Sequence, residues 1–238
     1  MLRLLHGWGL NAGVFQDLCS ALAVPVQALD LPGHGHAPYE PGSLAPAACA
    51  AALAGRFPEP GVWLGWSLGA FIALELAARH PHCVSALVLV AATPRFVTGP
   101  DWPCGTPAAD LQALGQRLSA DYEGTLRRFL TWQAGMADRA RVRALLATLM
   151  RAGGVRPEAL TEGLSVLRHS DLRDHMSAVR APTLVIHGAD DPVVNPEAGR
   201  WLAQRIPHAR FHEVGTGHAP FLSAEAAFVG LVRDFAHA

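Results

Sequence analysis

The chain has 238 residues, a length that suits one domain or one domain with a modest insertion. Half of the residues are hydrophobic and 16% are charged, which allows a large core and excludes a largely disordered chain. The formal net charge of −1 excludes an overall basic surface of the kind that binds nucleic acid.

The four cysteines lie far apart and none belongs to a CxxC pair, which disfavours a zinc site or a disulfide framework and indicates free thiols. Only Met1–Leu5 precedes the motif that begins at His6, and this segment is too short for a signal peptide. The most apolar segment, residues 62–78, is interrupted by glycines, a serine and a glutamate, so it does not predict a membrane span. We therefore expect a cytoplasmic monomer that binds neither nucleic acid nor a membrane.

Short apolar runs alternate with helical patterns along most of the chain. Strands are expected at Leu2–Leu5, Pro25–Asp30, Val62–Gly65, Ala86–Val90, Thr183–His187 and Arg210–Val214, each as a buried strand. Helices are expected at Gly13–Ala23, Leu44–Phe57, Gly69–His80, Pro196–Arg205 and Ala224–His237. Such alternation predicts an α/β fold with a mostly parallel sheet and helices on both faces.

One stretch, from about Thr106 to His169, interrupts this alternation. It has no strand pattern, and its helical patterns fall at Ala108–Leu118, Tyr122–Trp132 and Arg139–Arg151. We expect an all-helical cap insertion at residues 106–170, between two parts of the core at residues 1–105 and 171–238.

The pentapeptide Gly65-Trp66-Ser67-Leu68-Gly69 carries the strongest functional signal. It follows an apolar strand and begins a helix, which is the context of a nucleophile elbow. In an elbow the serine lies on a strained turn, and side chains two residues on either side would clash with the neighbouring strand and helix. An incidental serine in an ordinary strand-to-helix turn would give the same five letters. The flanking elements favour Ser67 as a nucleophile.

A nucleophilic serine needs a base, and the base needs an orienting carboxylate. Asp190 and Asp191 follow the strand that ends at His187, and His218 lies in a glycine-rich loop after the next strand. The order Ser, Asp, His at successive strand ends is that of the α/β-hydrolase fold, which predicts a triad of Ser67, Asp191 and His218. Asp190 is the rival acid, and we prefer Asp191 because Asp190 can stabilise the turn through its own backbone. Taken singly, Asp191 could be a turn or cap acid and His218 a loop histidine.

Two main-chain N–H groups are expected to form the oxyanion hole. Leu68 follows the nucleophile directly, and Trp8 lies in the loop His6-Gly7-Trp8-Gly9 after the first strand. Glycines at positions 7 and 9 let this loop approach the reacting group closely. The pair His34 and His36 could hold a metal, but no cysteine or acid lies at ligand spacing, so we expect neither a metal nor a cofactor.

Four segments of the sequence form a distinctive set: Leu4–Ala12 (LLHGWGLNA), Leu29–Gly35 (LDLPGHG), Trp63–Gly69 (WLGWSLG) and His218–Phe221 (HAPF). Together they resemble the pimeloyl-[acyl-carrier protein] methyl ester esterases of biotin synthesis. Shorter matches occur at Asp101-Trp102-Pro103, Arg128-Phe129-Leu130, Gly163-Leu164 and Asp171-Leu172-Arg173, so the similarity spans nearly the whole chain.

The resemblance implies a carboxylesterase that removes the methyl group from a pimeloyl ester carried on acyl-carrier protein, with the triad at the three positions given above. Little sequence precedes the HGWG strand, so the resemblance leaves the completeness of the sheet at that edge open. The substrate contacts of the family match Trp8, Ser67, Leu68, His218 and the cap residues Phe129, Leu130, Thr131, Trp132 and Gln133. On the residues alone, the aromatic and leucine side chains of this cap segment could equally be its own core.

Independently of any family, residues 124–156 hold seven arginines and a single acid, Asp138. Such a surface would attract an acidic, phosphate-bearing partner such as an acyl-carrier protein, although a solvated helix face in an arginine-rich protein is the alternative. The proposed docking residues are Arg127, Arg128, Arg139, Arg141 and Arg143.

Four other functions stay open at this point. A general short-chain esterase or lactonase, or a lyase-type relative of menaquinone synthesis, would use the same fold and motifs. A non-catalytic binding protein of the same fold is a further alternative, which a complete triad disfavours.

Overall fold

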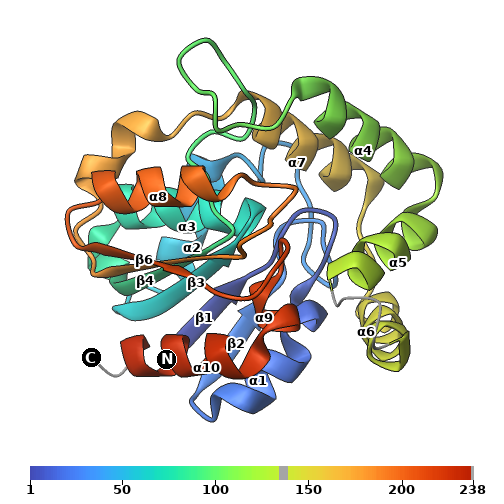
Figure 1. Ribbon diagram of the computed structural model, residues 1–238, viewed down its shortest axis with the longest axis horizontal. Helices are drawn as coiled ribbons and strands as arrows, with labels where there is room; N and C mark the ends of the chain where they lie inside the picture. Colours follow the sequence, from blue (N-terminus) through green and yellow to red (C-terminus); the bar gives the residue numbers. More distant parts are fainter. Residues whose placement is uncertain (134–138, 237–238) are drawn as a thin grey trace.

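The computed structural model describes residues 1–133 and 139–236, including all side chains except those at positions 129, 130, 132, 133, 139, 141 and 142. A six-stranded parallel sheet in the order β2-β1-β3-β4-β5-β6 runs through the centre (Figure 1). The strands are β1 (Leu2–Leu5), β2 (Val26–Leu29), β3 (Gly61–Trp66), β4 (Val84–Val90), β5 (Thr183–His187) and β6 (Ala209–Glu213). The predicted α/β fold is confirmed.

Burial along the strands follows their place in the sheet. All residues of β1 and β5 are buried, as expected for parallel strands covered on both faces. The prediction of a buried strand is wrong for β6, whose residues are exposed or half-buried, and for β2, of which only Leu29 is buried. Both are the edge strands, so each is paired on one side only.

Helices cover both faces of this sheet (Figure 1). One face carries α2 (Pro46–Arg56), α3 (Leu68–Arg79) and α8 (Pro196–Arg205), and the other carries α1 (Gln16–Leu22) and α10 (Glu225–Ala236). The short helix α9 (Pro220–Ser223) and the 3₁₀ turns η1 (Ala12–Phe15), η2 (Pro81–Cys83) and η3 (Arg173–Ala178) complete the core. Two apolar clusters result, one on each side of the sheet.

Four helices lie between β4 and β5 in the chain, in the region predicted as an insertion. They are α4 (Ala108–Ala120), α5 (Tyr122–Gln133), α6 (Arg139–Arg151) and α7 (Pro157–His169). Gly153 and Gly154, both with positive φ, separate α6 from α7. The division of the chain into a core and a cap at residues 106 and 170 stays a prediction.

Polar contacts fasten these helices to the loops that follow β1 and β2. The Tyr122 hydroxyl donates to the Gly9 carbonyl at 3.0 Å, and the Asn11 amide donates to the Leu149 carbonyl at 2.9 Å. Glu162 of α7 accepts from the Tyr39 hydroxyl at 2.7 Å and from two main-chain N–H groups of the same loop. These contacts fasten α5, α6 and α7 to the loops at the carboxyl ends of β1 and β2.

The two connections between the core and the four helices are linked to each other. Arg173 pairs with Asp101 and Asp171, each at 2.7 Å, and the Leu172 N–H donates to the Pro94 carbonyl at 2.8 Å. The segments that resembled the family at positions 101–103 and 171–173 therefore meet in space. Of the residues described, no helix combines the length and apolarity that crossing a membrane requires.

Candidate active site

Ser67 lies on the tight turn between β3 and α3. Its backbone adopts φ 55° and ψ −116°, a strained conformation for a residue with a side chain. The Ser67 N–H donates to the Val90 carbonyl at 3.0 Å, and its own carbonyl accepts from the Ala70 N–H at 2.9 Å. These two bonds hold the serine at the carboxyl end of the sheet.

The glycines of the pentapeptide have the role that the sequence predicted for them. A Cβ on Gly65 would lie 2.4 Å from the Gly69 carbonyl oxygen, and a Cβ on Gly69 would lie 2.3 Å from the Leu5 carbonyl oxygen. Main-chain atoms cannot yield at such distances, so any larger residue would open the turn.

His218 and Asp191 meet at the carboxyl ends of β5 and β6. The His218 Nδ1 lies 2.8 Å from Asp191 Oδ2, and both side chains are almost completely buried. Burial acts to raise the pKa of Asp191, but His218 and His187 beside it outweigh burial and hold this pKa well below its usual range. The carboxylate therefore stays ionised and can orient and stabilise a protonated imidazole.

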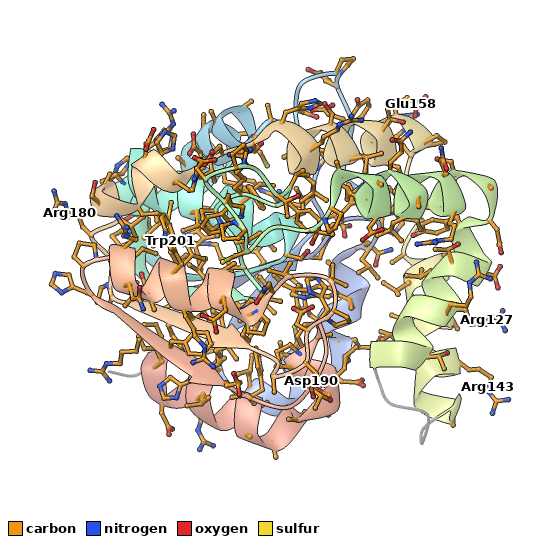
Figure 2. The ribbon with its side chains drawn as sticks, turned by 45° about the horizontal axis from the view of Figure 1, so that its top comes forward. Arg127, Arg143, Glu158, Arg180, Asp190 and Trp201 are labelled. Atoms are coloured by element: carbon orange, nitrogen blue, oxygen red, sulfur yellow. The ribbon has the colours of Figure 1, made fainter. Side chains whose placement is uncertain are left out.

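The second oxygen of Asp191 holds the turn in which it lies. Oδ1 accepts from the Val193 and Val194 N–H groups at 2.8 and 3.0 Å. We preferred Asp191 on the ground that Asp190 would hold this turn, but Asp191 does so itself, and Asp190 is exposed at the surface (Figure 2). The helix that follows is capped by Asn195, whose side chain accepts from the Glu197 N–H at 3.0 Å. Asn195, and not Asp191, therefore caps this helix, so the alternative of Asp191 as a helix-cap acid is wrong.

Two neighbours of this pair carried no signal in the sequence. His187 Nε2 lies 3.3 Å from Asp191 Oδ2 and 3.1 Å from the Val194 carbonyl, so with two acceptors before it this nitrogen carries the proton. Trp66 donates its indole N–H to the His218 carbonyl at 2.7 Å, which ties the histidine loop to the elbow. Both contacts join segments far apart in the chain, and neither spacing nor composition indicates them.

The expected oxyanion loop lies beside the serine. A Cβ added to Gly7 would approach the Ser67 Cβ to 3.3 Å, so the absence of a side chain there lets the loop come close. His6 holds the loop from below: its Nε2 accepts from the Leu31 N–H at 3.0 Å, so Nδ1 carries the proton and donates to the Gly7 carbonyl at 2.8 Å. Leu68 is the first residue of α3, and the first N–H groups of a helix have no partner within the helix. The donor roles of Trp8 and Leu68 stay predictions.

A small, mostly apolar pocket joins these groups. Ser67, His218, Gly7, Trp8 and Trp66 line its floor. Its other walls are Leu10, Phe96, Leu111, Leu114, Leu167 and Val193. Side chains of α4 and α7 therefore line the pocket of the serine, and most of the pocket surface is apolar.

Part of the predicted substrate and docking set lies outside the described side chains. Those residues are Phe129, Leu130, Trp132, Gln133, Arg139 and Arg141. Thr131 is half-buried on α5 and donates to the Arg127 carbonyl at 2.7 Å. Arg127, Arg128 and Arg143 are exposed, and Arg127 and Arg143 lie on the same side of the molecule (Figure 2).

His34 and His36, the considered metal pair, do not share a site. His34 is buried with Nδ1 2.9 Å from the Pro32 carbonyl, and His36 is exposed. Within the part of the chain that the structure describes, no group of three or more histidine, cysteine or acidic side chains is arranged to hold a metal ion.

Comparison with known proteins agrees with this geometry. Residues 4–231 match the model of the alpha/beta hydrolase family. An esterase from Exiguobacterium antarcticum superposes with a TM-score of 0.88 at 22% identity, covering 100% of this chain and 91% of the esterase, which supports the fold.

Closer relatives share the sequence over nearly its whole length. A pimeloyl-[acyl-carrier protein] methyl ester esterase from Chromobacterium violaceum is 42% identical over 97% of this chain and 92% of its own length. One from Xanthomonas oryzae pv. oryzae is 45% identical over 93% of this chain and 88% of its own. The chain therefore belongs to the alpha/beta hydrolase family and, within it, to the family of pimeloyl-[acyl-carrier protein] methyl ester esterases.

Proposed function

We propose that this protein hydrolyses the methyl ester of pimeloyl-[acyl-carrier protein] methyl ester to pimeloyl-[acyl-carrier protein] and methanol. The observation that carries the proposal is the 2.8 Å contact between Asp191 and His218, because His218 lines the same pocket as the strained Ser67. Relatives that share 42–45% of the sequence bear this name. The substrate is linked to a carrier protein, and the step belongs to biotin synthesis.

The reaction follows from the roles of the three side chains. His218 takes the hydroxyl proton as Ser67 Oγ attacks the ester carbonyl carbon, and Asp191 stabilises the imidazolium that forms. The C–OCH₃ bond breaks, methanol leaves with the proton from His218, and an acyl-enzyme remains. Water then attacks the same carbon, His218 passes a proton to Ser67 Oγ, and the free carboxylic acid is released.

Main-chain donors stabilise the negative charge that develops on the carbonyl oxygen. The N–H groups of Trp8 and Leu68 serve this role, and one such donor contributes about 3 kcal/mol to transition-state stabilisation. The groups are fixed before substrate arrives, because His6 holds the loop of Trp8 and helix α3 holds Leu68. The chemistry needs neither a metal nor a cofactor.

The carrier is recognised at the exposed arginines of α5 and α6. Arg127, Arg128 and Arg143 offer guanidinium groups that suit phosphate and carboxylate partners, and Arg139 and Arg141 belong to the same segment of the sequence. The acyl chain lies against the cap segment 129–133 and the apolar wall of the Ser67 pocket. The protein acts as a monomer in the cytoplasm.

Two experiments test the proposal. A fluorophosphonate probe should label Ser67 in the folded protein and fail to label a Ser67→Ala variant of equal Tm. The gene should restore growth without biotin to a bacterium that lacks its own pimeloyl esterase, and the Ser67→Ala gene should not. A folded protein that resists labelling contradicts the enzyme, whereas labelling without rescue favours a general short-chain esterase or lactonase.

A further inference from the structure

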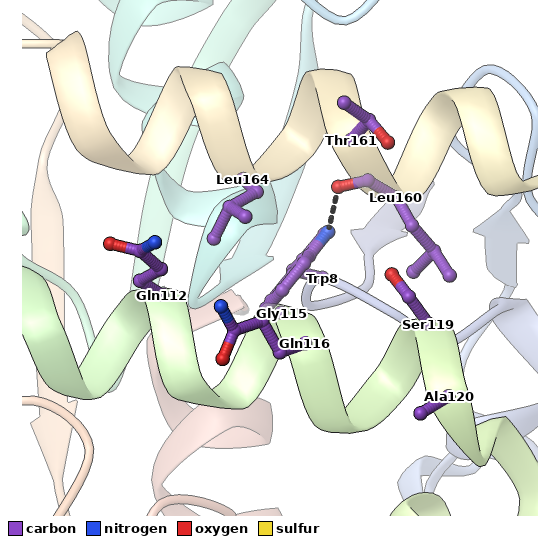
Figure 3. Close-up of a pocket in the computed structure, with 9 residues that line it drawn as sticks. All are labelled: Trp8, Gln112, Gly115, Gln116, Ser119, Ala120, Leu160, Thr161 and Leu164. Carbon is purple, nitrogen blue, oxygen red and sulfur yellow. Dashed lines mark hydrogen bonds between the residues drawn. The ribbon is translucent and has the colours of Figure 1, made fainter.

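A groove of about 470 Å³ lies between α4 and α7, outside the Ser67 pocket (Figure 3). Its lining mixes polar side chains, two glutamines, a serine and a threonine, with apolar ones that include two leucines. The lining residues are Trp8, Gln112, Gly115, Gln116, Ser119, Ala120, Leu160, Thr161 and Leu164. An open groove of this size that carries four polar side chains can hold water molecules.

The side chain of Trp8 separates the groove from the inner pocket. Trp8 lines both spaces, and the inner one contains Ser67 and His218. Its indole N–H donates to the Leu160 carbonyl of α7 at 3.0 Å, and this bond is drawn in Figure 3. A Cβ on Gly163 would lie 2.6 Å from Trp8 Cδ1, so α7 passes close over the ring without a side chain at this point. The hydrogen bond to Leu160 and the close approach of α7 at Gly163 hold the indole in place.

Hydrolysis of a carrier-bound ester requires a path for methanol and water that hydrolysis of a small ester does not. When methanol leaves, the acyl group is bonded to Ser67 at one end and to the carrier at the other. The prosthetic arm then fills the opening through which the substrate came, while methanol must still leave and a water molecule must still reach the acyl carbon. A second opening therefore speeds both events, provided that the carrier does not cover it.

The charges around the groove differ from those at the proposed docking site. Charges of both signs lie on the two groove helices: Asp110 in the first turn of α4 and Glu158 in the first turn of α7, Arg117 in the last turn of α4 and Arg168 in the last turn of α7. Arg127 and Arg143 lie on α5 and α6, away from Glu158 (Figure 2). An acidic carrier is therefore drawn more strongly to α5 and α6 than to the groove helices, where charges of opposite sign offset each other.

We propose that the groove between α4 and α7 is a second opening to the active site, which passes methanol and water while the carrier is attached, and that the Trp8 indole closes it. This inference rests on the proposed function. The indole opens the path by giving up its bond to Leu160 and turning into the groove. It shuts the path again when the bond re-forms, which keeps bulk water from the serine before substrate arrives.

The test fills the groove from its two sides. Gln116→Trp on α4 and Thr161→Trp on α7 place a large ring in the groove, at exposed positions that do not line the Ser67 pocket. Arg117→Trp is the matched control, because it adds the same ring at an exposed position of α4 that does not line the groove. Each variant is assayed on the carrier-bound methyl ester and on dimethyl pimelate, which has no carrier. An unchanged Tm excludes misfolding.

The acyl-enzyme provides a direct readout, because it joins enzyme and carrier covalently and runs at their summed mass after an acid quench. We expect the groove variants to accumulate this conjugate and to lose about fivefold in kcat on the carrier-bound ester. Dimethyl pimelate turnover should stay within about twofold, as should both rates of the Arg117→Trp control.

Three outcomes would overturn the second opening. The first is equal slowing on both substrates, and the second is a conjugate level in both groove variants no higher than in the control. The third is a raised KM for the carrier-bound ester without conjugate, which would place the prosthetic arm in the groove. A different result would contradict the proposed function itself: an unmodified enzyme that cleaves dimethyl pimelate but does not cleave the carrier-bound ester. The proposal of a second opening would then fail as well, because it rests on that function.

Discussion

At the scale of single residues, Asp191 does two things with its two oxygens. Oδ2 faces His218 and His187, and Oδ1 holds the turn through two main-chain N–H groups. A carboxylate with all of its near neighbours acting as donors is fixed in orientation and strongly favoured in its ionised form. In this arrangement the carboxylate at position 191 contacts His218, whereas Asp190 is exposed at the surface.

We predict that Asp191→Asn lowers kcat by about 10³–10⁴-fold with little change in KM for the ester. The amide that replaces Oδ2 would donate to His218 Nδ1, so the imidazole would carry its proton on the nitrogen that must accept from Ser67. Asp190→Asn is the matched control and should keep near-normal activity. Steady-state rates of the two variants decide the matter, and a larger loss in the Asp190 variant would reverse the assignment.

The site was predictable from the sequence where its groups lie at the ends of elements. Ser67 and His218 each follow a recognisable strand and have glycines beside them, so order and flanking residues predicted both. The same order placed the acid at position 190 or 191 but did not decide between them, and the reason given for Asp191 was wrong because Asp191 itself holds the turn. His187 and Trp66 were missed because each acts through a contact across the sheet. A histidine ending a buried strand, or a tryptophan before the serine, has no pattern of its own.

At the scale of elements, a buried pair of histidines joins two loops below the site. The ring centroids of His6 and His34 lie 5.0 Å apart. Burial, and for His6 also the nearby His34, lowers the pKa of both imidazoles below the usual value of about 6.5. His6 spans the loop of Trp8 and the loop of Leu31, and His34 forms a bridge to Val155 just before α7.

This pair predicts an acid-sensitive stability. Below about pH 6.5 the unfolded chain takes up protons at these imidazoles, whereas the folded chain does not. The contribution of the neutral imidazoles to the free energy of unfolding is therefore complete above that pH and is lost as the pH falls. The loss approaches about 1.4 kcal/mol per pH unit for each imidazole. His34→Phe should therefore flatten the fall of Tm between pH 7 and pH 5, even if it lowers Tm at pH 7. His36→Phe, at an exposed histidine, should keep the original slope, and equal slopes in both variants would exclude the pair as the cause.

Most elements could be predicted to within two residues because hydrophobic periodicity reports burial. The central strands and α8 matched their predicted ranges closely, since each has a clear pattern and a Gly, Pro or polar boundary. The position of a strand in the sheet cannot be predicted in this way, because it depends on which strands pair with each other. For this reason β6, an edge strand, was wrongly expected to be buried. Helix α7 lay within the predicted helical region but was not separated there, although Gly153, Gly154 and Pro157 mark its beginning.

At the scale of the whole molecule, the net charge near zero hides an uneven distribution, because positive charge is concentrated on α5 and α6. The segment with seven arginines and one acid was counted from residue 124, so it left out Asp121 and Glu123, which lie just before it. Arg127 pairs with Glu123 at 2.8 Å, and Arg128 lies 3.6 Å from Asp121. Both pairs are exposed, so they are weak and can be exchanged for contacts with a partner. The positive field of α5 and α6 is therefore smaller than the count implied, though its sign is the same.

We predict that reversing Arg127, Arg128 and Arg143 to Glu raises KM for the carrier-bound ester by about tenfold and leaves kcat nearly unchanged. The cause is the lost electrostatic attraction of an acidic carrier. Raising the ionic strength should therefore raise the KM of the unmodified enzyme for the carrier-bound ester and reduce the difference in KM between it and the variant. Turnover of a small p-nitrophenyl ester should be the same in both.

The matched control reverses Arg180, Arg205 and Arg210, three exposed arginines outside α5 and α6 that give the same change in net charge. If both triple variants lose equally on the carrier-bound ester, net charge and not a docking surface steers the carrier. If the first variant loses equally on the small ester, the arginines support the structure of the helices above the site. Only a loss that is confined to the carrier-bound ester and to the arginines of α5 and α6 assigns that surface to the carrier protein, because a local field acts on a charged partner and leaves a neutral substrate unaffected.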